Sequence, residues 1–129
     1  MVKFGSVSCL VRVARWLELN MELVVMNGPA VFTALAVVDR LVRDGDSCTV
    51  VLDRLAVALL CEDAVSRQPL LITASLHPVG HLLAREVVSK ANILTATKDT
   101  ILSVLLVNLD TLRYTKTGAN VLRGLHGVV

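Results

Sequence analysis

The chain has few aromatic residues, no strong excess of either charge and no long apolar run. Aromatic residues make up 3% of its 129 residues, and 13 basic residues against 11 acidic ones give a formal net charge of +2. Nucleic-acid-binding surfaces usually cluster Lys and Arg and present rings that stack on bases, so we expect no nucleic-acid partner. The longest apolar stretch, residues 23–38, is broken by Asn27, Gly28 and Pro29 and is shorter than the roughly 20 residues that cross a bilayer, so we expect no membrane span.

Cysteine is also scarce. The three cysteines include no Cys-x-x-Cys pair, which argues against a disulfide framework or a zinc ribbon and favours a reducing compartment. We therefore predict a cytoplasmic protein. The alternative is an organelle matrix, because the first 17 residues carry basic side chains and no acidic one, as presequences do. His77 and His81 are four residues apart without an obvious third ligand, so we expect no metal and no cofactor.

Apolar residues are abundant, at 54% of the chain. A domain of this size cannot easily bury so many, and we therefore expect a homo-oligomer or a permanent protein partner. Residues 1–20 predict an N-terminal amphipathic helix or extension, and residues 21–129 predict a single domain. The apolar face of the N-terminal helix is expected to comprise Val7, Leu10, Val11, Ala14 and Leu17.

The most informative segment runs from Met21 to Asp53 and predicts one βαβ unit. The run Glu22–Met26 predicts a strand, and the helical spacing of valine and leucine from Pro29 to Asp44 predicts a helix that Gly45 ends. The β-branched run Cys48–Leu52 has no polar alternation, as expected for a strand covered on both faces. A right-handed connection would make the two strands parallel neighbours.

The same alternation continues to the C-terminus. Further strands are predicted at Leu70–Ala74, Ile93–Ala96 and Thr111–Tyr114, and further helices at Arg54–Arg67, Val79–Ala91, Thr97–Asn108 and Thr117–Leu125. Strands alternating with helices are typical of an α/β fold. We therefore predict a doubly wound, mainly parallel sheet of four or five strands with flanking helices.

An all-α fold is the alternative, because runs of Val, Leu and Ala suit a buried helix as well as a buried strand. In this interpretation the chain forms stacked helical hairpins. Pro29 and Pro78 then open two similar blocks, each a helix pair, with the spacing of one helical repeat.

The order and spacing of these segments resemble the DsrE/DsrF/DsrH family of small α/β sulfur-relay proteins. The resemblance covers residues 21–114 and follows the apolar pattern of the βαβ unit and of the segment from Leu70 onwards. It implies assembly into oligomers. The sulfur carriers of that family use a cysteine in the loop after the third strand, whereas this loop is Ala74-Ser75-Leu76-His77-Pro78. The resemblance therefore implies a non-catalytic subunit.

Ligands of open parallel sheets bind beyond the carboxyl ends of the strands, and polar residues are predicted there. A carboxylate, a hydroxyl, an imidazole and an amine at that edge would suit anion binding or acid–base chemistry, whereas the same residue types also serve as turns and helix caps. The candidate residues of this crevice are Asn27, Gly28, Asp53, Ser75, His77 and Lys98, with Thr97 beside the last.

Three functions are compatible with these patterns. The leading hypothesis is a non-enzymatic assembly or binding subunit of an oligomeric α/β complex, DsrE-like in shape. The first alternative is an all-helical protein–protein interaction module, such as a viral or organelle accessory protein. The second alternative is a small enzyme with a crevice near Asp53 and His77, although the sequence favours a protein without enzymatic activity.

Overall fold

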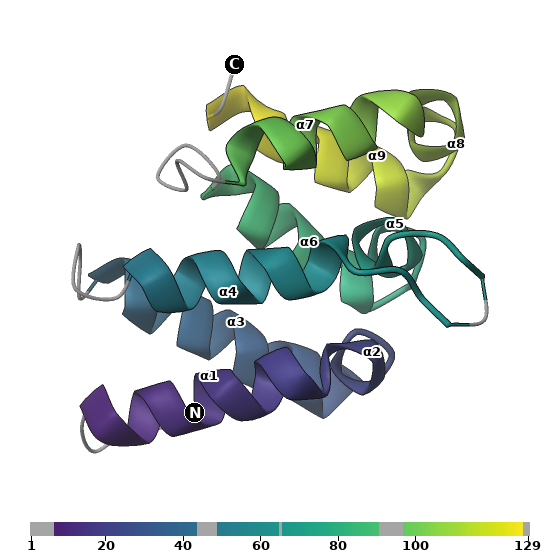
Figure 1. Cartoon of the computed structure of the whole chain (residues 1–129). Coiled ribbons are helices and arrows are strands. Elements are labelled where there is room, and N and C mark those ends of the chain that lie inside the picture. Colours follow the sequence, from purple (N-terminus) through teal and green to yellow (C-terminus); the bar gives the residue numbers. More distant parts are fainter. Residues whose placement is uncertain (1–6, 44–48, 65, 91–96, 128–129) are drawn as a thin grey trace.

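The computed structural model describes residues 7–43, 49–64, 66–90 and 97–127, and its regular elements there are helices, apart from one isolated β-bridge between Glu62 and Pro69 (Figure 1). The longer helices are α1 (Val7–Leu19), α3 (Gly28–Arg43), α4 (Thr49–Leu60), α6 (Gly80–Ser89), α7 (Lys98–Val107) and α9 (Lys116–Arg123). Three short helices, α2 (Met21–Val24), α5 (Leu70–Ser75) and α8 (Leu109–Arg113), lie between them, and a 3-10 turn, η3 (Gly124–Gly127), ends the described chain.

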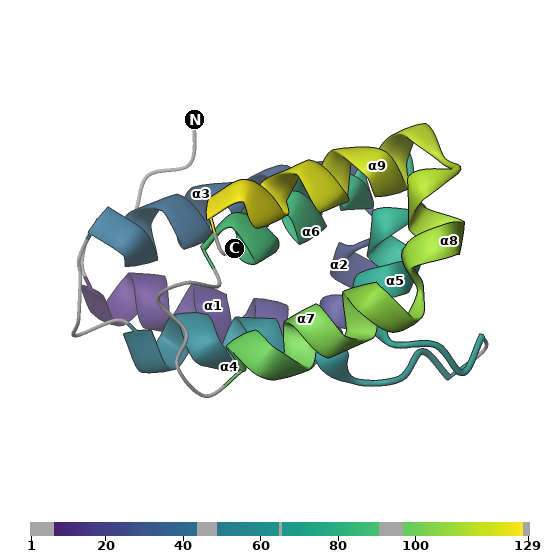
Figure 2. The ribbon, with the colours of Figure 1, turned by 90° about the horizontal axis from the view of Figure 1, so that it is seen from above.

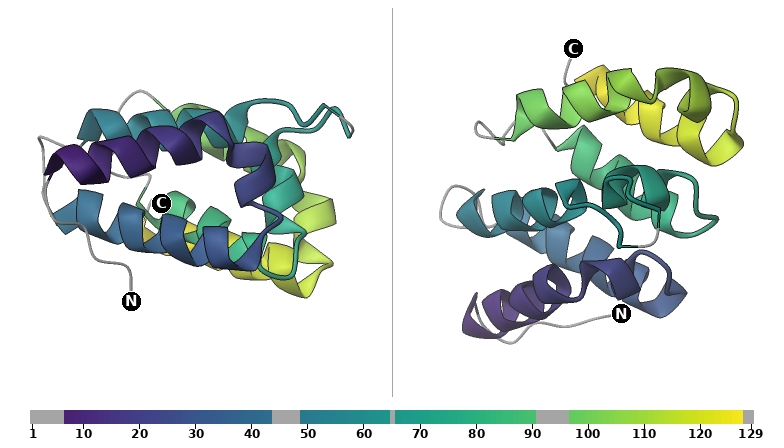
Figure 3. Two further views of the ribbon diagram at one scale, coloured as in Figure 1. Left: turned by 90° about the horizontal axis from the view of Figure 1, so that it is seen from below. Right: turned by 45° about the vertical axis from the view of Figure 1, so that its right-hand side comes forward.

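The longer helices form two rows. Helices α1, α4 and α7 make one row and α3, α6 and α9 make the other, with the short helices crossing between the rows at one end (Figure 2). Seen from the side, the chain climbs through three tiers, each with a long helix, a short helix and a second helix (Figure 3). Helix α6 lies at the centre, because it packs against α3, α5, α9 and η3.

The second helix of each tier begins with the same kind of hydrogen bond. The backbone N–H donates to a side chain three residues earlier, from Ala30 to Asn27 Oδ1 at 3.0 Å, from Gly80 to His77 Nδ1 at 3.0 Å and from Gly118 to Thr115 Oγ1 at 3.2 Å. Such bonds satisfy N–H groups that lack a partner in the first turn. The tiers therefore repeat a local signal that starts a helix, with a different residue type in each.

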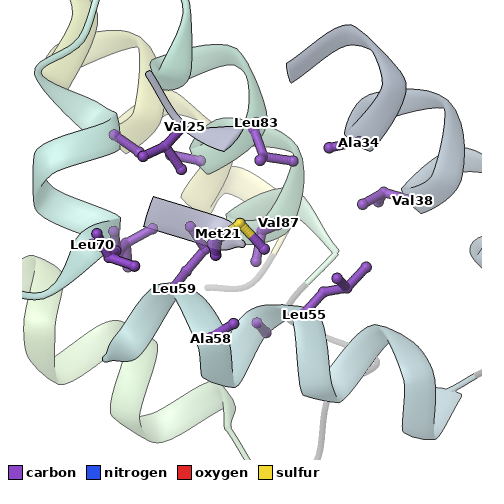
Figure 4. Packing of buried hydrophobic residues seen from close by; sticks show 14 of the residues in the cluster. Met21, Val25, Ala34, Val38, Leu55, Ala58, Leu59, Leu70, Leu83 and Val87 are labelled. Carbon is purple, nitrogen blue, oxygen red and sulfur yellow. The ribbon is translucent and has the colours of Figure 1, made fainter. Parts of the chain in front are cut away.

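The buried faces also repeat. Alanine followed three and four residues later by valine occurs in both Ala34–Val38 and Ala84–Val88, and all six of these side chains are buried. Helices α3 and α6 pack directly against each other, and all six side chains belong to the same buried apolar cluster. In Figure 4, Met21 from α2 points between Leu59 of α4 and Val87 of α6. One apolar core thus connects the tiers.

The structure contradicts the α/β prediction and confirms the all-helical alternative. No strand or sheet occurs in the ranges described above, so the parallel sheet and the DsrE-like shape are both wrong. Three of the predicted strands fall on helices: Glu22–Met26 on α2 and the turn after it, Leu70–Ala74 on α5, and Thr111–Tyr114 mainly on α8. In the predicted strand Cys48–Leu52, residues Thr49–Leu52 belong to α4. Cys48 and the predicted strand Ile93–Ala96 lie outside the described residues.

Helix α4 shows why the prediction failed. The apolar residues Leu52, Leu55, Ala56 and Leu59 are buried at helical spacing, and this spacing continues past Asp53, which the sequence predicts to follow the end of a strand. The helix consequently begins at Thr49 and ends at Leu60, well before the predicted end. Among the described residues no helix has the length and apolar content that a bilayer crossing requires.

Helix α1 differs from its predicted pattern in one residue. Leu10, Ala14 and Leu17 are buried against the core, whereas Val11 is exposed. The side chain of Val7 lies outside the described set.

Thr115→Ala should destabilise the chain by about 1 kcal/mol, the usual cost of losing a side-chain cap. The Thr115 hydroxyl accepts from the Gly118 N–H and donates to the Leu112 carbonyl at 3.1 Å, so the change removes both bonds. Denaturant unfolding would measure the loss. Thr117→Ala, two residues later and without a capping role, serves as the matched control and should not lower stability. Equal stability of the two variants would contradict the capping role.

Candidate functional site

A pocket of about 850 Å³ opens where the first two tiers meet. Its walls come from the end of α1, from α2, from the start of α3, from the loop after α4 and from α5. Trp16, Leu23, Met26 and Leu70 make most of the lining apolar. The volume falls within the usual range of ligand pockets, which are mostly apolar with a few placed polar groups.

One wall continues outside the pocket as an apolar stripe. Trp16, Leu19, Leu23 and Met26 follow one another at steps of three and four residues, and their exposed fractions are 54%, 70%, 68% and 55%. We call these four residues the apolar stripe. The other side of the same segment carries the buried side chains of Leu17, Met21 and Val24. Single exposed apolar residues are ordinary, but Trp16, Leu23 and Met26 are exposed and also line one pocket, which marks an interaction surface.

The opposite wall is held by the loop between α4 and α5. Its two arms pair through Asp63 N–H to Gln68 O at 2.7 Å and Leu70 N–H to Cys61 O at 2.8 Å. The Asp63 carboxylate accepts from Ser66 Oγ at 3.0 Å and from Thr73 Oγ1 at 3.4 Å, which ties the loop to α5. This carboxylate therefore keeps a defined position in the pocket wall.

The charged residues that line the pocket are acidic. Glu22 and Asp63 both line it, and none of the Lys or Arg residues that the structure describes does. Asn27 and Thr73 add neutral polar groups. The pocket therefore favours an apolar group that carries a positive charge nearby.

Of the residues predicted from the sequence, Asn27 alone lines this pocket. Its side-chain oxygen is engaged with the Ala30 N–H, in the capping role expected for it. Gly28 begins α3 and lies beside Val79, which precedes α6. These residues and His77 thus belong to the same end of the stack.

Ser75 and His77 serve the local backbone. The buried Ser75 hydroxyl donates to the Leu71 carbonyl at 2.6 Å. His77 Nδ1 accepts from the N–H groups of Val79 and Gly80 at 3.1 and 3.0 Å. His81 Nδ1 lies 3.1 Å from the His77 carbonyl oxygen, and the described residues contain no group of three potential metal ligands.

Asp53, Thr97 and Lys98 lie toward the other end of the stack, where α4 and α7 begin (Figure 1). The buried Thr97 hydroxyl donates to Asp53 Oδ1 at 3.0 Å and so connects the two helices. Lys98 begins α7 and is half-buried. The structure therefore does not bring Asp53 and His77 into one crevice.

The apolar stripe was not among the predicted site residues. The sequence does contain a signal for it. Leu17, Met21 and Val24 form one apolar set that is buried, and Trp16 begins a second apolar set in the same segment, which is exposed. A helix that is apolar on two faces needs two partners. Treating residues 22–26 as a strand concealed the continuity of that face.

Comparisons of this chain with protein families, with curated proteins and with solved structures gave no match.

Proposed function

We propose that this chain is a helical protein-interaction module whose pocket binds an apolar segment of a partner protein. The observation that carries the proposal is the apolar pocket of about 850 Å³ with the exposed apolar stripe along one wall. Stacked helical units commonly present extended binding surfaces, and a helix laid in an apolar groove is a recurrent mode of recognition.

The pocket also limits the chemistry of the partner. Its two acidic residues, Glu22 and Asp63, favour a segment in which a Lys or Arg stands next to the apolar anchor. Leu19 lies on the stripe outside the pocket and extends the apolar area beyond what a small ligand needs. A protein segment therefore fits the surface better than a small molecule does.

Trp16 gives a direct test, because it is the only tryptophan and lines the pocket. A synthetic amphipathic helix of leucine and lysine should shift Trp16 emission to shorter wavelength in a saturable way, since the ring loses water contact. Leu23→Asp should weaken this binding by about tenfold or more, the loss typical of an anchor residue. Leu106→Asp on α7 is the matched control, because Leu106 is exposed to a similar extent but lies outside the pocket, and this variant should bind like the wild type.

Two results would contradict the proposal. The first is equal binding by a leucine–glutamate helix, which would show no selection by Glu22 and Asp63. The second is a concentration-dependent Trp16 shift without peptide, accompanied by dimers in light scattering, which would make a second copy of the chain the occupant.

A further inference from the structure

A second cavity, of about 450 Å³, lies at the turn between α8 and α9, in the third tier. It is lined by Arg113, Tyr114, Thr115, Lys116, Ala119 and Arg123. It shares no residue with the apolar pocket, and its chemistry is the reverse. The apolar pocket holds two acids and no cation, whereas this cavity holds three cations and no acid.

Among the residues that the structure describes, the three cations of this basic cavity have little compensation from acidic side chains. Asp110, outside the lining, approaches Arg113 Nε at 3.9 Å, and both side chains are exposed. An exposed pair at that distance contributes little. Like charges around one cavity disfavour one another, and an anion between them removes that repulsion.

Arg113 is held in place by its neighbour. Its guanidinium carbon lies 5.1 Å from the centre of the Tyr114 ring, and its Nη2 lies 3.3 Å from the Tyr114 hydroxyl. A guanidinium fixed in this way presents its planar donors with less loss of rotamer freedom on binding. The positive end of the α9 dipole adds to the same field, because α9 begins at Lys116.

We propose that this cavity binds a doubly charged phosphate group on a phosphorylated side chain of a partner protein. Arg and Lys around a polar cavity are the groups that recognise phosphorylated peptides. A nucleic acid would need a longer track of cations and several stacking rings, whereas the cavity has three cations and the single ring of Tyr114. The proposal stands independently of the apolar pocket.

Tyr114 reports on the cavity because it is the only tyrosine of the chain. The full chain, with ring-labelled tyrosine, would be titrated by NMR with inorganic phosphate and then with a phosphoserine peptide and its unphosphorylated form, at constant ionic strength set by chloride. We expect a saturable shift of the Tyr114 ring signals with phosphate and with the phosphopeptide. The unphosphorylated peptide and chloride should leave these signals unchanged.

The double variant Lys116→Gln, Arg123→Gln should bind the phosphopeptide about tenfold or more weakly, since it removes two charged donors. Both side chains are exposed, and a thermal unfolding curve would show that the fold is kept. The matched control is Arg12→Gln, Arg54→Gln, which removes two exposed cations outside both cavities and should bind like the wild type.

Three outcomes would overturn the proposal. They are a Tyr114 shift of equal size with chloride, undiminished binding by the cavity variant, and tighter binding of a single-stranded oligonucleotide than of the phosphopeptide. Trp16 emission reads the apolar pocket separately, so failure of one site is distinguished from failure of the other.

Discussion

Gly80→Ala should destabilise the chain by about 2 kcal/mol, although alanine usually stabilises a helix relative to glycine. A Cβ atom on Gly80 would lie 2.5 Å from the Val25 carbonyl oxygen and 3.1 Å from the Ala74 carbonyl oxygen. Both neighbours are backbone atoms, so neither can rotate away. The backbone that follows α2 or the end of α5 would have to move, and denaturant unfolding followed by circular dichroism would measure the cost.

Gly28→Ala is the matched control, because Gly28 also stands at the start of the second helix of a tier. A Cβ atom added to Gly28 would have Val79 Cγ1 as its nearest neighbour, at 4.0 Å, which is an ordinary van der Waals contact. Because alanine leaves the unfolded chain fewer conformations than glycine does, Gly28→Ala should leave the free energy of unfolding unchanged or raise it by up to about 1 kcal/mol. If Gly80→Ala proved as stable as Gly28→Ala, the close approach of α6 to Val25 would be refuted.

The second helices of the tiers could be predicted from the sequence because each begins with a strong local signal. Asn27 and Pro29 mark the start of α3, and His77 and Pro78 precede α6. The observed ends of α3, α6 and α9 each differ from the predicted ends by one or two residues. Capping groups and proline act within one turn of the chain, so their effect does not depend on the rest of the fold.

The short helices could not be predicted in this way. Helices α2, α5 and α8 have four to six residues, which is too few to show a helical period. Leu70, Leu71 and Ile72 are all buried, so the segment is apolar on every side, as a buried strand would be. Contacts with α4 and α6 decide that it is helical, and these contacts are not visible in a single sequence.

The apolar pocket could not be predicted from the sequence, for the same reason. The polar residues chosen from the sequence depended on a sheet edge. In the structure Asn27 and His77 accept from N–H groups at helix starts, and Thr97 links α7 to Asp53 on α4. The apolar pocket depends instead on tertiary placement of the loop that carries Asp63 against the stripe that begins at Trp16. Residues 47 positions apart share no local pattern.

Leu83→Ala should destabilise the chain by about 3 kcal/mol, the largest effect that we expect from one apolar substitution. Leu83 is fully buried on α6, the central helix, and faces Val25 and Ala34 in the core (Figure 4). The change removes buried methyl groups and leaves a cavity that the neighbouring helices cannot close without moving.

Leu106→Ala on α7 is the control, since 63% of that side chain is exposed and its loss should change stability by less than about 0.5 kcal/mol. A cost below about 1 kcal/mol for Leu83→Ala would show that the core around α6 is loosely packed.

The slope of the unfolding free energy with denaturant concentration adds a second criterion, because this slope scales with the surface that unfolding exposes. Stability in stacked units is a sum over units and their interfaces, and α6 takes part in the interfaces with both α3 and α9. An unchanged slope would therefore mean that the three tiers still unfold together when the central helix α6 is weakened, whereas a reduced slope would mean that an outer tier has separated first.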